Sequence, residues 1–206
     1  MLKKLLKNTT FQSIIKDYYK QNKDNIVDIL LFGSIMRGKE KPNDVDLLII
    51  SKNTLTNNVI YNLRKSLKKL DLNFSITEKT YHELFQPSFL AREAFLTEAY
   101  SLINKKFVSK GLGFTNYYLF KYELKGFNKS KRMLFYYSLY GRNNSKGMIN
   151  KLKAIKFSDG TLLVPIENVE EGREYFNNLE IKFNDFPILI PERVSAVLYQ
   201  SSRKTN

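Results

Sequence analysis

Apolar residues recur along the chain with two periods, one typical of helices and one typical of strands. In the first half, strand patterns occur at residues 26–32, 44–51, 70–77 and 102–108, and helical patterns occur at residues 11–19, 59–70 and 89–100. Thr9 or Thr10 is placed to cap the first helix. The clearest strand pattern is at residues 70–77, where apolar and polar side chains alternate strictly. The first half therefore combines strands with helices.

The sequence Gly111-Leu112-Gly113 predicts a hinge. Beyond it, strands are expected at residues 117–124, 162–166 and 181–190, helices at residues 128–139 and 168–178, and a basic amphipathic piece at residues 148–156. These elements indicate a small α+β module. We therefore predict an α/β (α+β) protein with domains at residues 1–110 and 114–192, followed by a C-terminal tail at residues 193–206.

The stretch from Leu31 to Ile50 contains the residues with the clearest chemistry. Asp44 and Asp46 are two positions apart on a predicted strand, so their carboxylates project from the same face. Adjacent carboxylates repel each other, and hard oxygen ligands side by side suit Mg²⁺ that carries substrate phosphates. Upstream, Gly33 lets the backbone approach a ligand closely, and Ser34 offers a hydroxyl and an amide to a phosphate.

These residues stand in a characteristic order. An apolar strand is followed by Gly33-Ser34, Arg37-Gly38, a polar loop and Asp44-Val45-Asp46, which resembles the signature of the DNA polymerase β-like nucleotidyltransferase superfamily. The resemblance covers about the first half of the chain. It implies a mixed sheet flanked by helices, with Mg²⁺ held by the acid pair against an NTP. The residues that it assigns to the nucleotide are Gly33, Ser34, Arg37 and Lys39.

The superfamily also places a third carboxylate on a strand beside the Asp-x-Asp strand. Asp71 is the only acid on the polar face of the predicted strand at residues 70–77. The resemblance therefore assigns to Asp71 the third place in the metal site and the role of a base for the attacking hydroxyl. Asn73 lies on the same polar face, and if the family position falls on Asn73 the third acid has been lost.

Composition adds a strong positive charge. The chain has 206 residues and a formal net charge of +14, and thirteen basic residues lie between residues 101 and 156, where Glu123 is the only acid. Such an excess indicates a polyanion-binding surface. The chain has no cysteine, so disulfides and thiolate metal sites are excluded. No apolar run reaches the length of a membrane span, and we expect a cytoplasmic protein that does not bind membranes.

Aromatic residues are interleaved with the basic residues of this segment. Exposed rings can stack on unpaired bases while Lys and Arg follow the phosphates. At strand or helix spacing at least half of the rings face inward, so rings close to the loop at residues 141–147 are the better candidates. The residues expected to contact nucleic acid are Lys129, Lys131, Arg132, Tyr137, Tyr140, Arg142 and Lys146.

The leading hypothesis is an Mg²⁺-dependent enzyme that transfers a nucleoside monophosphate from an NTP to a hydroxyl acceptor and releases pyrophosphate. The basic second domain favours RNA, such as tRNA or another structured RNA, as the acceptor. Two alternatives stay open. One is a catalytically inactive protein that uses the nucleotidyltransferase fold to bind nucleic acid. The other is a nucleotidyltransferase of the toxin–antitoxin type, which modifies a protein.

Overall fold

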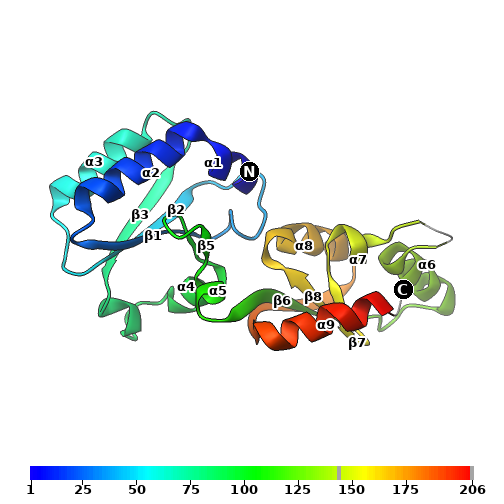
Figure 1. Ribbon diagram of the computed structural model, residues 1–206. Helices are drawn as coiled ribbons and strands as arrows, with labels where there is room; N and C mark the ends of the chain where they lie inside the picture. Colours follow the sequence, from blue (N-terminus) through cyan, green and yellow to red (C-terminus); the bar gives the residue numbers. More distant parts are fainter. Residues whose placement is uncertain (143–144, 205–206) are drawn as a thin grey trace. The chain divides into compact units, whose positions relative to one another are not determined.

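The computed structural model describes residues 1–142 and 145–204, and the chain divides into two compact units, Met1–Leu112 and Gly113–Asn206 (Figure 1). The first unit contains a mixed sheet with the strand order β3-β2-β1-β4-β5. β1 is antiparallel to β2 and β4, whereas β2 and β3 are parallel. The strands are β1 (Ile26–Phe32), β2 (Val45–Ser51), β3 (Phe74–Thr80), β4 (Tyr100–Ser101) and β5 (Lys106–Phe107).

Helices cover both faces of the sheet in the first unit (Figure 1). Its helical segments are α1 (Leu2–Lys7), α2 (Thr9–Asn22), α3 (Asn57–Leu67), the 3₁₀ turn η1 (Glu83–Phe85), α4 (Arg92–Glu98) and α5 (Val108–Gly111). On one face, the ring of Phe11 in α2 stacks on Phe74 of β3, with centroids 5.9 Å apart. On the other face, Leu30 and Leu48 pack with Leu84 of η1. β1 and β2 are thus buried on both faces, which explains their continuous apolar sequences.

Three expectations for this unit were wrong in detail. The cap of α2 is Asn8, whose side chain accepts a hydrogen bond from the backbone N–H of Phe11 at 2.9 Å, rather than Thr9 or Thr10. The third strand begins at Phe74 and not at Leu70, because the backbone N–H of Leu70 still bonds to the carbonyl of Leu67 at the end of α3. Residues 102–108 do not form one strand; they contain the turn between β4 and β5.

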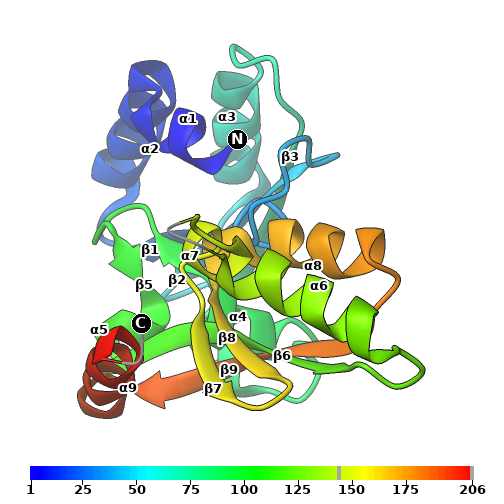
Figure 2. The same ribbon diagram turned by 90° about the vertical axis from the view of Figure 1, so that its right-hand side faces the viewer.

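The second unit is built on an antiparallel sheet with the strand order β7-β8-β6-β9. Its strands are β6 (Phe114–Glu123), β7 (Ile155–Ser158), β8 (Thr161–Pro165) and β9 (Lys182–Pro191), and its helical segments are α6 (Lys129–Tyr140), α7 (Met148–Lys151), η2 (Ile166–Asn168), α8 (Val169–Asn178) and α9 (Glu192–Lys204). α8 lies on one side of this sheet and α9 on the other (Figure 1, Figure 2). On the side of α8, Phe120 of β6 stacks on Phe176 of α8, and Tyr122 meets Phe135 of α6 edge to face.

The expectation of a C-terminal tail is wrong, because residues 192–204 form α9. The hydroxyls of Tyr117 and Ser195 lie 3.0 Å apart in the interior, and Leu198 packs against the buried cluster of Tyr117, Ile155 and Leu163. The basic piece at residues 148–156 is divided between α7 and β7. Its buried residues Ile149, Leu152 and Ile155 are three positions apart, a spacing that resembles the apolar face of a single helix. Among the residues that the structure describes, no helix is long and apolar enough to cross a membrane.

Candidate nucleotide site and basic surface

The turn after β1 lies against an acidic side chain of β2. Phe32, the last residue of β1, pairs with Asp46. Gly33 follows with a φ of +82°, and a Cβ atom at this position would collide with Oδ2 of Asp46. The backbone then turns at once, because the carbonyl of Gly33 accepts a hydrogen bond from Met36 at 3.0 Å. Glycine is required here both by its backbone conformation and by the close approach of the carboxylate.

Asp44 and Asp46 form an acid pair beside this turn. Asp44 is exposed and directly precedes β2, whereas Asp46 lies within β2 and is half-buried. Burial raises the pKa of Asp46 above its ordinary value, and the negative charge of Asp44 raises it further. The positive charge of Arg37 and a hydrogen bond from the Ser75 hydroxyl act in the opposite direction. The pair is therefore a place where added positive charge lowers the free energy of the folded protein.

β3 presents Ser75 to the acid pair. The parallel register places Ser75 opposite Asp46, and the backbone N–H of Val45 donates to the carbonyl of Asn73 at 2.8 Å. The strand neighbour of Asp46 is thus a hydroxyl residue. No sequence signal singled out Ser75, which is one of several polar residues in an alternating segment.

Asp71 does not lie where the sequence pattern placed it. It is exposed in the bend between α3 and β3, outside the strand, so the expectation of a carboxylate on the polar face of that strand is wrong. Over residues 1–142 and 145–204, no three Asp, Glu, His or Cys side chains are grouped so that they could hold a metal ion. The structure brings Asp44 and Asp46 together and does not add Asp71 to them.

Arg37 and Lys39 differ in their surroundings. Nη1 of Arg37 lies 2.7 Å from Oε2 of Glu98, whose side chain is buried at the end of α4. This ion pair ties the turn after β1 to α4, and the sequence contains no signal that could have found Glu98 as the partner. Lys39 is exposed, and its backbone N–H donates to the carbonyl of Ser34 at 3.3 Å.

In the second unit, α6 and the loop after it contain the residues expected to contact nucleic acid. Lys129 and Lys131 are exposed in the first turn of α6, and so is Lys146 in the loop. The guanidinium of Arg142 lies over the ring of Tyr137, 4.8 Å from its centroid, and Tyr137 is 38% exposed. These side chains are accessible to a ligand.

Arg132 and Tyr140 have structural partners. Arg132 donates hydrogen bonds to the carbonyls of Phe127 and Leu124, at 3.0 and 3.5 Å, and so holds the turn before α6. Tyr140 is half-buried, and its ring stacks on Tyr136 with centroids 6.1 Å apart. These contacts account for the two side chains without a ligand.

The positive charges of α6 lie at its N-terminal end, where the helix dipole is unfavourable for cations. The first turn contains basic residues and no acid, whereas cations are favourable at the C-terminal end of a helix and anions at the N-terminal end. Beside this turn, a shallow groove of about 480 Å³ is lined by Phe127, Lys129, Arg132, Met133, Tyr136 and Tyr137. The arrangement attracts anions to an apolar and aromatic surface.

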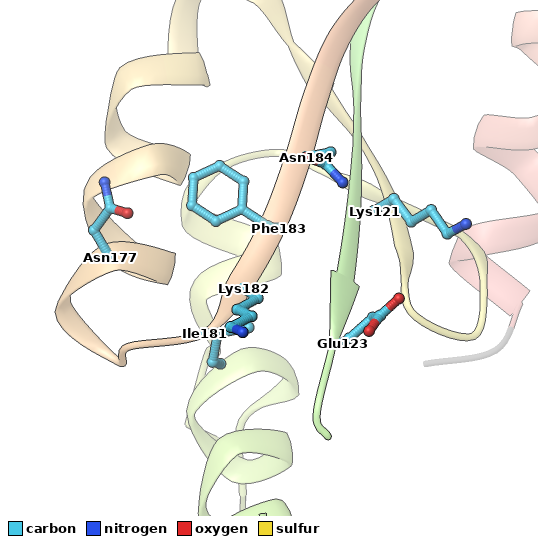
Figure 3. Close-up of a pocket in the computed structure, with 7 residues that line it drawn as sticks. All are labelled: Lys121, Glu123, Asn177, Ile181, Lys182, Phe183 and Asn184. Atoms are coloured by element: carbon cyan, nitrogen blue, oxygen red, sulfur yellow. The ribbon is translucent and has the colours of Figure 1, made fainter. Parts of the chain in front are cut away.

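A second, polar hollow of about 500 Å³ lies at the end of the sheet where β6 finishes and β9 begins. Figure 3 shows Lys121 and Glu123 projecting from β6 on one side and Asn177 from α8 on the other. Lys182 lies opposite Glu123 in the register of β6 and β9. The hollow thus combines positive, negative and amide groups and has no single charge preference.

Comparison with known proteins agrees with the motif in the first unit. Residues 13–98 match the family model "Polymerase beta, Nucleotidyltransferase". Comparison with curated proteins gave no significant match. A mutant of the toxin–antitoxin MntA-HpeT is similar, with 20% identity over 44% of this chain and 70% of that chain and a TM-score of 0.35.

Two further solved structures are similar to the chain. One is a toxin–antitoxin with AMP-PNP, which has 24% identity over 44% of this chain and 71% of that chain and a TM-score of 0.35. The other is tri-AMPylated Shewanella oneidensis HEPN toxin in complex with MNT antitoxin, with 21% identity over 44% and 67% and a TM-score of 0.32. The family match spans the Gly33-Ser34 turn and the acid pair. Residues 13–98 of this chain therefore form a nucleotidyltransferase domain of the DNA polymerase β-like superfamily.

Proposed function

We propose that this domain binds an NTP and transfers its nucleoside monophosphate to a hydroxyl acceptor, with release of pyrophosphate. The observation that carries the proposal is the close approach of Gly33 to the carboxylate of Asp46. A triphosphate held by the turn lies next to two acids that can hold a cation against it. In the transfer, the acceptor oxygen forms a bond to the α-phosphorus while the bond from that phosphorus to pyrophosphate breaks.

The residues of the site fit Mg²⁺. Asp44 and Asp46 offer hard carboxylate oxygens, and the repulsion between them, which adds to the effect of burial in raising the pKa of Asp46, falls when a cation lies between the two. When bound, Mg²⁺ neutralises charge on the phosphates. The protein's own groups position the substrate: Gly33 and Ser34 contact the phosphates, Arg37 keeps the turn in place through Glu98, and the exposed Lys39 adds positive charge.

The direct test is incubation of the full chain with each α-³²P-labelled NTP, Mg²⁺ and either total RNA or total protein. Label on an acceptor, with unlabelled pyrophosphate released, supports the proposal. Label on protein alone would favour the protein-modifying alternative over RNA. Absence of label with every NTP and both pools would reject transfer.

We further propose RNA as the acceptor. The support is the basic and aromatic surface on α6, because stacking on rings and neutralisation of phosphates together suit unpaired nucleotides. Lys129 and Lys131, the two exposed cations in the first turn of α6, oppose the helix dipole, so their placement costs helix stability, and an anionic ligand would offset this cost. Use of an NTP and of RNA agrees with the cytoplasmic location expected from the sequence.

Binding of RNA should depend steeply on salt. If about six cations neutralise phosphates, log affinity falls against log salt with a slope of roughly −4 for single-stranded RNA. Replacing Lys129, Lys131 and Lys146 with Gln should reduce this slope by about 2, as measured by fluorescence anisotropy. The matched control is Lys151→Gln with Lys156→Gln, because these lysines are already paired with Glu171 and Asp159. Equal slopes for both variants, or no RNA binding at low salt, would exclude this surface.

A second candidate function is binding of nucleotide and nucleic acid without transfer. The observation that favours it is Ser75, since a hydroxyl residue and not a third acid lies opposite Asp46. This protein would bind an NTP and RNA and leave the label in the free nucleotide. The labelling experiment described above separates the two functions directly.

A further inference from the structure

The first unit contains a pocket of about 430 Å³ between helices α1 and α2 and the turn that joins β4 to β5. Leu30 and Leu48 belong to the apolar cluster on one face of the sheet, and Asp46, two residues before Leu48, projects to that same face. Tyr100 lines the pocket and pairs with Leu31, the residue next to Leu30, so it projects to the opposite face. The pocket is therefore separate from the acid pair.

The interior of this pocket is apolar and aromatic. Phe11 and Ile15 are buried at its base, and the half-buried residues that line it are Leu6, Tyr19, Tyr100, Leu102 and Ile103. The ring of Tyr100 is held edge to face by Phe107, with centroids 5.4 Å apart. The volume lies in the range of small-molecule sites, and the rings favour a ligand with a flat apolar body on which they can stack.

The walls of the pocket are held in place by polar contacts. The hydroxyl of Ser101 donates to the carboxylate of Asp28 at 2.8 Å, and the side-chain amide of Asn104 donates to the same carboxylate at 3.1 Å. These bonds fix the turn between β4 and β5. Between α1 and α2, the side-chain amide of Gln12 donates to the carbonyl of Leu6. Because both walls are held before a ligand arrives, less conformational entropy is lost on binding.

Two exposed cations, Lys16 and Lys105, line the same pocket. Over residues 1–142 and 145–204, neither ammonium group has a carboxylate partner, and the lining contains no acid. Lys105 has a φ of +54°, a conformation that favours Gly or Asn, yet a basic side chain occupies this position. Positive charge thus lies beside an apolar interior, and its complement is a ligand with one anionic group.

We propose that this pocket binds a small aromatic carboxylate, whose rings contact Tyr19 and Tyr100 and whose charged group pairs with Lys16 and Lys105. An aromatic acid fits better than a nucleotide, because the apolar side chains of the walls would leave the polar edges of a base without hydrogen-bond partners. The inference does not depend on the proposed function, since the pocket and the acid pair lie on opposite faces of the sheet.

The test is a fluorescence titration of the full chain with 1-anilinonaphthalene-8-sulfonate, an aromatic anion, and with N-phenyl-1-naphthylamine, which has the same rings without the charge. Replacing Lys16 and Lys105 together with Gln should weaken binding of the anion by about 10-fold, since one exposed ion pair contributes up to about 5-fold, and should leave binding of the neutral probe unchanged. The matched control replaces Lys65 and Lys68 with Gln. Both are exposed in the same unit and lie outside the pocket lining, so this variant should bind both probes like the wild type.

Tyr19→Leu tests the aromatic contact. It should weaken binding of both probes by about 5-fold, because a stacking ring is lost, and leucine is a good helix former, so α2 should keep its stability in thermal unfolding followed by circular dichroism. In competition with the wild type, 1-naphthoate should displace the anionic probe and AMP should not. The inference is overturned if the wild type binds neither probe, if the Lys16 and Lys105 variant binds the anion like its control, if Tyr19→Leu binds both probes like the wild type, or if AMP competes as well as 1-naphthoate.

Discussion

Asp44→Ala and Asp46→Ala are each expected to reduce nucleotidyl transfer by at least about 100-fold, the size of effect seen when one charge-stabilising group is removed from an active site. Each change removes an oxygen ligand and its negative charge, while the apolar core contributed by Leu47 and Leu48 stays intact. Transfer is measured as the initial rate of label incorporation from an α-³²P-labelled NTP.

The same variants should keep the fold. Because burial and Asp44 raise the pKa of Asp46, its ionised form is less stable in the folded than in the unfolded chain, and a neutral residue removes this cost above that pKa. At neutral pH the melting temperature of Asp46→Ala without Mg²⁺ should equal or exceed that of the wild type. Asp71→Ala is the control, since Asp71 is exposed outside β3 and its removal should leave transfer unchanged. Full activity of Asp44→Ala or Asp46→Ala would contradict the mechanism.

Gly33→Ala is expected to remove NTP binding and to destabilise the first unit. A left-handed φ of +82° costs about 1–2 kcal/mol for a residue with a Cβ. The added methyl group also collides with Oδ2 of Asp46, so either the turn or the carboxylate must move. Binding is measured by titration with a fluorescent ATP analogue, and stability by circular dichroism during thermal unfolding.

Gly113→Ala is a control that separates the two effects of Gly33→Ala, the cost of the backbone conformation and the collision with Asp46. Gly113 has the same φ of +82°, but a Cβ atom there meets no atom within 4 Å. The control should show only the conformational cost and should bind nucleotide like the wild type. Equal losses of stability in the two variants, with NTP binding kept in Gly33→Ala, would show that the contact between the turn and Asp46 has no role in the site.

Much of the fold could be predicted because it depends on local pattern. The bounds of β1 agree with the apolar run at residues 26–32, and α6 and α8 lie close to their predicted ranges. The predictions fail where the spacing of buried residues resembles that of a different secondary structure. Ile149, Leu152 and Ile155 repeat at a helical interval, yet they belong to a short helix, a turn and a strand, and the tail expected after residue 192 is a packed helix.

Within the site, the sequence by itself determined the acid pair and the glycine turn. Two residues at i and i+2 near the start of a strand project to one face whatever the strand pairs with, and Gly33 directly follows a strand of clear apolar pattern. Both features depend only on neighbouring residues. The pairing of Arg37 with Glu98 is of the opposite kind, since it joins residues 61 positions apart and depends on the packing of α4.

Only the tertiary structure decided which residue of the third strand meets Asp46. In the alternating sequence pattern, Asp71, Asn73 and Ser75 share one predicted polar face, and a shift of two residues exchanges them without moving any apolar side chain to the other face. The choice is made by contacts distant in sequence: Phe74 stacks on Phe11, and Val45 bonds to the carbonyl of Asn73. A period of two determines the face of a strand, whereas the register along it is determined by what the strand packs against.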